Sequence, residues 1–150
     1  MHRLMLVIIA AMMLLQAHVS VAQNPHKLRF YEYSGFGGKC TICPVERYQH
    51  CYYLAKRTAD AASSLYFRNE DYNNEEFSIT LYTSETCSGD WFRKSTNIPY
   101  KAAYSISSFA SKYDNKIQSF KIANFRLPDA EGTMTGSEPW TASCDFSPSC

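Results

Sequence analysis

The sequence has no apolar run long enough to cross a membrane. Its longest run, Leu4 to Leu15, is about a dozen residues, whereas a spanning helix needs about 20. The run follows a short basic start at Met1-His2-Arg3 and precedes small residues that end at Ala22, which is typical of a secretory signal peptide. We therefore expect residues 1–22 to be a signal peptide, the protein to be secreted and extracellular, and no transmembrane anchor to remain. An uncleaved N-terminal anchor is the less favoured alternative.

The sequence also lacks an excess of charge of either sign. It has 15 Lys and Arg against 14 Asp and Glu, and loss of Arg3 with the signal peptide makes the two counts equal. A neutral chain is not drawn electrostatically to nucleic acid or anionic lipid. We expect no nucleic-acid partner. The specific partner is unknown from the sequence, and an extracellular protein or a cell-surface target is the class that remains.

Histidine is scarce, and recognisable catalytic motifs are missing. Only His26 and His50 lie beyond the signal peptide, and neither stands in a hydrolase-like motif. A Ser-His-Asp or Cys-His arrangement is therefore not expected. The sequence predicts no catalytic residue, and the protein is predicted not to be an enzyme.

Cysteine, in contrast, is well represented in the mature part of the chain. In an oxidising compartment six cysteines predict three disulfides, although the sequence does not choose among the 15 pairings. We expect the last two cysteines to attach the C-terminal tail to the body. A zinc or redox role for the Cys-x-x-Cys pair is less favoured, because a matching second pair is missing. The predicted disulfide cysteines are Cys40, Cys43, Cys51, Cys87, Cys144 and Cys150.

Aromatic residues suit a β-sheet protein, and the chain has eleven Tyr and nine Phe. From Phe77 to Leu81 apolar residues alternate with hydroxylated ones, which indicates a strand buried on one face. The polar stretch 69–76 is predicted to connect two halves of the chain, and the glycines and prolines beyond Arg126 predict an irregular tail. The predicted strands are 28–31, 51–54, 64–67, 77–82, 90–93 and 117–123.

A pattern of strand, aromatic residue and glycine occurs twice. Tyr31 is followed after six residues by Gly38, and Tyr82 is followed after six residues by Gly89. Each pair leads to a polar turn with serine and then to a closing strand. The glycine allows a positive φ where a hairpin folds back onto its sheet. One long connection per half predicts a Greek key, and two Greek keys predict a sandwich.

These spacings, together with the segment from Asp114 to Ile122, resemble the βγ-crystallin Greek-key family. The match is stronger over 77–122 and weaker over 28–68, where the chain is widened around three cysteines. The resemblance implies an all-β, disulfide-stapled sandwich of the βγ-crystallin type in residues 23–125, with Greek keys at about 28–68 and 77–123. Residues 126–150 are then an irregular, cysteine-containing C-terminal tail.

Many members of that family bind calcium at a six-residue signature of two Asn or Asp, two variable residues, Ser or Thr, and Ser. Here the first copy, residues 59–64, has Ala59 in the first position. The second copy, residues 114–119, has Gln118 where the hydroxyl ligand belongs. Because each copy departs from the signature at one position, we expect weak calcium binding, with a dissociation constant of about 10⁻⁴ to 10⁻³ M, or none. The candidate calcium ligands that the resemblance implies are Asp60, Ala61, Ser63, Asn115, Lys116 and Gln118.

The resemblance implies a secreted, non-enzymatic protein with a structural or protective role and weak calcium binding. A small secreted toxin or antimicrobial effector of the same fold is the alternative. A carbohydrate-binding module is a third hypothesis, which requires an exposed row of aromatic side chains.

Overall fold

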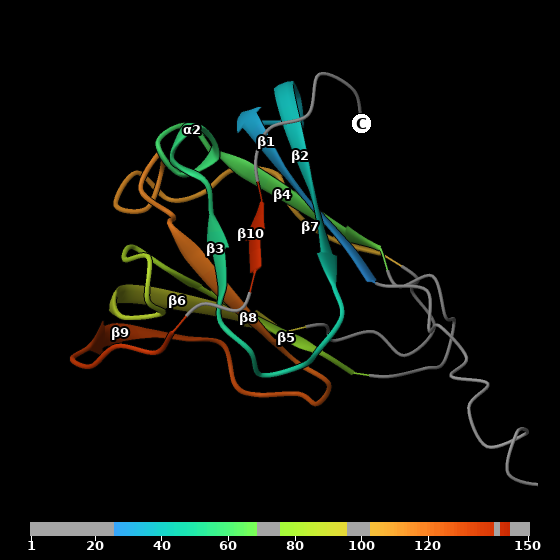
Figure 1. Cartoon of the computed structure of the whole chain (residues 1–150). Helices are drawn as coiled ribbons and strands as arrows, with labels where there is room; N and C mark the ends of the chain where they lie inside the picture. The colour runs from blue at the N-terminus through green and yellow to red at the C-terminus, as the bar shows by residue number, and fades with distance from the viewer. Residues whose placement is uncertain (1–25, 69–75, 96–102, 140–141, 145–150) are drawn as a thin grey trace, which may run out of the picture.

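The computed structural model describes residues 26–68, 76–95, 103–139 and 142–144. In these residues two β-sheets pack face to face around one core (Figure 1). No helix within these ranges is long and apolar enough to cross a membrane. The predicted signal peptide, most of the predicted connection 69–76, and Cys150 lie outside the described residues.

Ten strands and one short helix are labelled in Figure 1. They are β1 (His26–Tyr33), β2 (Gly37–Val45), β3 (Tyr52–Leu54), α2 (Lys56–Ala59), β4 (Ser64–Arg68), β5 (Ser78–Tyr82), β6 (Gly89–Ser95), β7 (Ala103–Ile106), β8 (Ser119–Ala123), β9 (Ala130–Met134) and β10 (Ala142–Cys144).

The two halves of the chain exchange strands between the sheets. The four-stranded sheet has the order β2-β1-β4-β7, and the six-stranded sheet has the order β10-β3-β8-β5-β6-β9. Strand β3 of the first half thus pairs with β8 of the second, whereas β7 of the second half pairs with β4 of the first. Each half keeps its other three strands in one sheet. The predicted all-β sandwich of two Greek keys is confirmed.

The two glycines of the repeat have equivalent surroundings. Gly38 and Gly89 have φ values of +76° and +77°, which L side chains rarely adopt. A Cβ on Gly38 would lie 2.9 Å from the Glu32 side chain, and one on Gly89 would lie 2.9 Å from Thr83 Oγ1. Glu32 and Thr83 hold the same place in the two hairpins, six residues before the glycine. In both hairpins this side chain also accepts a hydrogen bond, at 3.0 Å, from the amide that follows the glycine.

A buried serine fastens each folded hairpin to its closing strand. Ser64 Oγ donates to the carbonyl of Tyr33 (2.7 Å) and accepts from the amide of Phe36 (3.2 Å). Ser119 Oγ repeats the arrangement in the second hairpin, where it accepts from the amide of Cys87 (3.0 Å). Both serines are fully buried. The internal repeat is therefore a repeat of hydrogen bonds as well as of residues.

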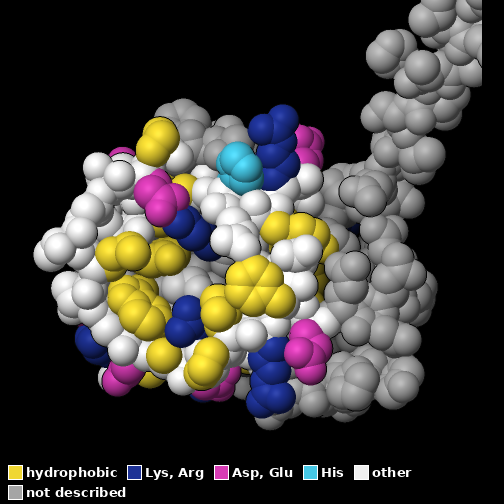
Figure 2. Space-filling model, turned by 90° about the horizontal axis from the view of Figure 1, so that it is seen from below, with side chains coloured by type: hydrophobic (Ala, Val, Ile, Leu, Met, Phe, Trp, Pro, Cys, Tyr) yellow, Lys and Arg dark blue, Asp and Glu magenta, His cyan; other side chains and the backbone are white. Residues whose placement is uncertain are grey.

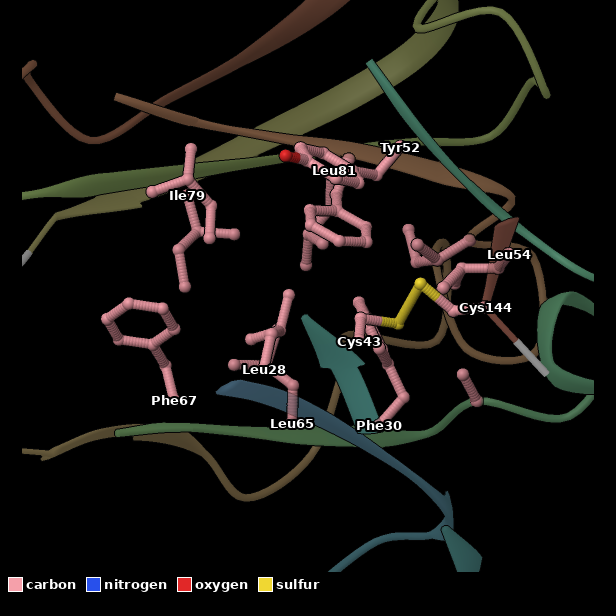
Figure 3. Close-up of a cluster of buried hydrophobic side chains, with 14 of the residues drawn as sticks. Leu28, Phe30, Cys43, Tyr52, Leu54, Leu65, Phe67, Ile79, Leu81 and Cys144 are labelled. Carbon is pink, nitrogen blue, oxygen red and sulfur yellow. A yellow bond between two sulfur atoms is a disulfide. The ribbon is translucent and has the colours of Figure 1, made fainter. Parts of the chain in front are cut away.

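The core lies between the sheets and is made by alternate strand residues. Leu28 and Phe30 face it from β1, and Ile79 and Leu81 face it from β5 (Figure 3). In β5 the intervening residues are buried too, unlike the half-buried strand that the alternation predicts. The reason is that other parts of the chain cover the outer face of β5. Ser78, for example, hydrogen-bonds to the carbonyl of Phe125 (3.0 Å).

Two disulfides are defined in the described residues. Cys43–Cys144 joins β2 of the four-stranded sheet to β10 of the six-stranded sheet, and Figure 3 shows it at one end of the core. Cys51–Cys87 joins the start of β3 to the hairpin between β5 and β6. Cys40 is disulfide-bonded as well. The expectation that Cys144 attaches the tail to the body is confirmed.

The tail is more regular than its glycines and prolines predict. Strand β9 pairs with β6, and β10 pairs with β3 in the one parallel pairing among the described strands. Edge strands offer main-chain hydrogen bonds that do not require an alternating apolar pattern in the added strand. Gly132 also allows close packing, since a Cβ there would lie 3.0 Å from the Trp91 ring.

Candidate functional site

The two closing turns of the repeat meet at one place in the structure. The first turn follows α2 and contains Asp60 to Ser63, and the second contains Asp114 and Asn115. The amide of Asn115 donates to the carbonyl of Ala62 (3.1 Å), and Ser63 Oγ donates to Asn115 Oδ1 (3.2 Å). The strand exchange thus brings together two turns that lie about fifty residues apart in the chain.

A pocket of about 430 Å³ opens beside these turns. Four of the six predicted calcium ligands line it: Asp60, Ala61, Ser63 and Asn115. The other lining residues were not among the predicted ligands. Asp114 had a sequence signal, because it is the first residue of the second signature copy. The remaining lining residues, which no sequence motif indicates, are Glu32, Tyr33 and Ser34.

The pocket has the electrostatics of a cation site. Three carboxylates line it, those of Glu32, Asp60 and Asp114, and no Lys or Arg of the described part of the chain does. Asp114 Oδ1 is buried and has no hydrogen-bond partner among the described residues. A buried carboxylate oxygen without a partner is costly, and a hard cation such as Ca²⁺ binds oxygen ligands of this kind. The donors present therefore fit calcium.

The other two predicted ligands, Lys116 and Gln118, do not line this pocket. The amide of Gln118 donates to the carbonyl of Tyr82 (2.8 Å), and its own carbonyl accepts from the amide of Leu54 (2.8 Å). Ser63 makes the corresponding two bonds in the first half. Gln118 is therefore the second-half equivalent of Ser63. It belongs to the corresponding position of the second half and not to this pocket.

Comparison with known proteins gave one structural likeness. No family model matches the chain, and no curated protein matches it. Among solved structures, the chain is similar to one described as "Evolution of the eye lens beta-gamma-crystallin domain fold". The two are 14% identical with a TM-score of 0.46, and the match covers 72% of this chain and 95% of that one.

The decisive observation is the topology of the chain itself. Two Greek keys, each with a glycine-folded hairpin and a serine at its closing turn, exchange their third strands between two sheets. The chain has a fold of the βγ-crystallin type. The added strands β9 and β10 extend one sheet of this fold at both edges.

The second half of the βγ-crystallin-type sandwich is a poorer place for a cation. The offsets of the repeat place Thr83, Asn115 and Ala59 where the first site has Glu32, Asp60 and Asp114. They also place Glu85 and Asp60 where the first site has Ser34 and Asn115. The second position therefore has one carboxylate fewer and gains the ammonium group of Lys116. That group lies near Asp90, whose pKa is lowered by a hydrogen bond from Thr133 and by the nearby lysine charges.

The first site is not a ready-made metal centre either. Across the described ranges, no three His, Cys, Asp or Glu side chains lie close enough together to hold a metal ion. A bound cation would therefore need hydroxyl, amide and main-chain oxygens in addition to carboxylates. Such a ligand set suits calcium, which accepts six to eight oxygens in flexible geometry.

Proposed function

We propose that this protein is a secreted, non-enzymatic protein of the βγ-crystallin type, with a structural or protective role, which binds one calcium ion weakly between its two closing turns. The observation that supports this most is Asp114: its buried Oδ1 atom has no hydrogen-bond partner among the described residues. Asp114 lines a pocket whose described lining has three carboxylates and no Lys or Arg. Calcium at this site would bind both halves of the repeat and hold them together.

Weak affinity follows from the contacts that the ligands already make. Glu32 accepts a hydrogen bond from the amide of Lys39, and Asn115 Oδ1 accepts one from Ser63. An ion must displace or share these hydrogen bonds, which costs part of its binding free energy. We therefore expect a dissociation constant of about 10⁻³ M, in the range of extracellular calcium modules.

Thermal unfolding in a calcium series tests the proposal. A ligand that binds only the native state stabilises it by RT ln(1 + [L]/Kd), which is about 1.4 kcal/mol when calcium is at ten times its dissociation constant. For a domain of this size that free energy raises Tm by roughly 5 °C. In Asp114→Asn the calcium-dependent rise should vanish, because the variant has lost a carboxylate of the pocket.

Asp90→Asn is the matched control. Asp90 is a carboxylate outside the pocket, paired with Lys112 and Thr133, so this variant should keep the full calcium response although its basal Tm changes. An equal calcium response in Asp114→Asn and the wild type would contradict the site. A magnesium series at equal ionic strength separates calcium binding from general screening.

Secretion and the alternative effector role stay predictions of the sequence. Inhibition of bacterial or fungal growth by the purified protein is the measurement that would favour the effector role over the structural one.

A further inference from the structure

A second cavity, of about 470 Å³, lies at one end of the sandwich, between strands β6 and β9 and the segment that begins at the end of β7. We propose that it is a binding site for a small, uncharged, mainly apolar molecule that carries a carbonyl group. The inference depends on the internal repeat and does not depend on calcium binding.

In the first half of the repeat, the position that corresponds to the cavity is filled by another part of the chain. Lys94 and Ala110, which line the cavity, are the equivalents of Cys43 and Ala55, 51 and 55 residues earlier in the chain. In the first half, Cys144 is bonded to Cys43, and its carbonyl accepts a hydrogen bond from the amide of Ala55 (2.6 Å). A small apolar side chain and a carbonyl oxygen therefore occupy the first-half position that corresponds to the cavity.

Three aromatic side chains, Phe92, Phe109 and Tyr113, form part of the lining of the cavity. The Phe92 ring lies 4.5 Å from the Tyr113 ring and 5.9 Å from the Phe109 ring, measured between centroids. All three side chains are buried, and Ile106 of β7 adds a further apolar surface. Removing apolar ligand surface from water against such walls is favourable. The volume lies within the usual range for small-molecule sites, about 300 to 1,000 Å³.

The charged groups at the rim are already paired, which favours an uncharged ligand. Lys94 Nζ lies 2.9 Å from Asp129 Oδ2. Glu131 Oε2 lies 3.1 Å from the hydroxyl of Tyr113. Arg93 donates to the carbonyl of Pro128 (2.9 Å). The cavity thus has two acidic and two basic residues in its lining, and a charged ligand would find no net complementary charge.

The carbonyl requirement follows from Ala110. Its equivalent, Ala55, donates its amide to the carbonyl of Cys144, so the same amide in the second half is the expected donor to a ligand oxygen. A ligand acceptor at this amide would fix the orientation of an otherwise apolar molecule.

Prodan, an uncharged aromatic ketone whose fluorescence shifts to the blue in apolar surroundings, is a direct probe. We expect saturable binding of one prodan per oxidised full chain, with a blue-shifted emission. The anionic dye anilinonaphthalene sulfonate should bind at least tenfold more weakly. Absence of saturable prodan binding, or tighter binding of the anionic dye, would overturn the proposal.

A variant that fills the cavity locates the probe. Ala130 lines the cavity from β9, and Ala130→Trp should weaken prodan binding at least tenfold. Met134→Trp is the matched control, because Met134 lies on the same strand, is exposed and is not part of the lining. It should bind prodan like the wild type. Equal binding by Ala130→Trp and the wild type, with both variants folded by circular dichroism, would place the probe elsewhere and refute the site. Calcium affinity should be the same in both variants, so the two proposals fail separately.

Discussion

At the scale of single residues, Ser64 and Ser119 close the two folded hairpins. Each hydroxyl joins its closing strand to main-chain groups of its hairpin, and both side chains are fully buried. Replacing Ser119 by Ala leaves the buried amide of Cys87 without this partner, which costs about 1–3 kcal/mol. We expect Ser119→Ala and Ser64→Ala to lower the free energy of unfolding by that amount in urea titrations.

Ser34 provides the control for these variants. It is exposed, and its hydroxyl contacts Ser108 Oγ at 3.0 Å. Ser34→Ala should change stability by no more than about 0.5 kcal/mol, as exposed substitutions usually do. If Ser119→Ala lowered the free energy of unfolding no more than Ser34→Ala, the hydrogen bonds of the buried serines would not stabilise the hairpins.

Tyr104 gives the protein a pH dependence at the alkaline end. Burial, with a smaller contribution from the negative charge of Asp129, raises the pKa of Tyr104 to about 12. The unfolded value is about 10, so the native state holds the proton more tightly. Its contribution to stability is complete below pH 10 and is lost as pH rises through 12. Tyr104→Phe should flatten the fall of unfolding free energy over this interval, measured by urea titration at successive pH values. An unchanged slope would contradict it.

The residues of the repeat could be predicted from the sequence because glycine and serine have specific effects on the local backbone. The tyrosine–glycine spacing predicted both hairpins, since few residues other than glycine adopt the required positive φ. The composition of the pocket was harder to predict from the sequence. Glu32 joins Asp60 and Asp114 only through the fold-back of a hairpin and the crossing of strands, and neither leaves a periodic signal in the sequence.

At the scale of elements, the two defined disulfides should differ in what they stabilise. The residues of Cys43–Cys144 are separated by 101 positions and those of Cys51–Cys87 by 36. In the chain-entropy model the longer loop corresponds to about 5 kcal/mol and the shorter one to about 4 kcal/mol. We expect Cys43→Ala/Cys144→Ala to be the more destabilising pair, because it also frees β10 from the body.

Denaturant unfolding of the two double variants measures these costs, and amide hydrogen exchange shows where they act. In Cys43→Ala/Cys144→Ala, protection should fall first at β3, the pairing partner of β10. In Cys51→Ala/Cys87→Ala it should fall first at the hairpin between β5 and β6. Uniform loss of protection in both variants would show that the disulfides act on the unfolded chain alone.

Strands with alternating apolar residues were predicted near their observed positions, but four strands and α2 were not. Strand β2 contains two glycines and Pro44, which are residues that usually interrupt strands. They are tolerated because β2 is an edge strand with one partner, so the missing amide of proline breaks no hydrogen bond on its open side. Strands β9 and β10 form on sheet edges whose positions depend on the whole fold.

At the scale of the whole molecule, the exchange of β3 and β7 makes the two Greek keys dependent on each other. Among the described residues, the main core cluster takes ten buried residues from each half of the chain. Most large apolar side chains in the described ranges are buried in this way. Some hydrophobic side chains remain on the surface on the side of the six-stranded sheet, with Lys and Arg among them (Figure 2). Neither half therefore has a complete core of its own.

The chain divided at the connection between the halves tests this dependence. Fragments 23–76 and 77–150 should each be unfolded alone, because each would lose the strand that completes its sheet and half of the shared core. A chain of about 50 residues rarely folds with so small a core unless disulfides stabilise it, and both defined disulfides join one half to the other. Circular dichroism should show sheet only when the fragments are mixed under oxidising conditions. A fragment that unfolds cooperatively by itself would mean that the repeat consists of two independent folding units, and the strand exchange would then be a late docking step instead of the basis of the fold.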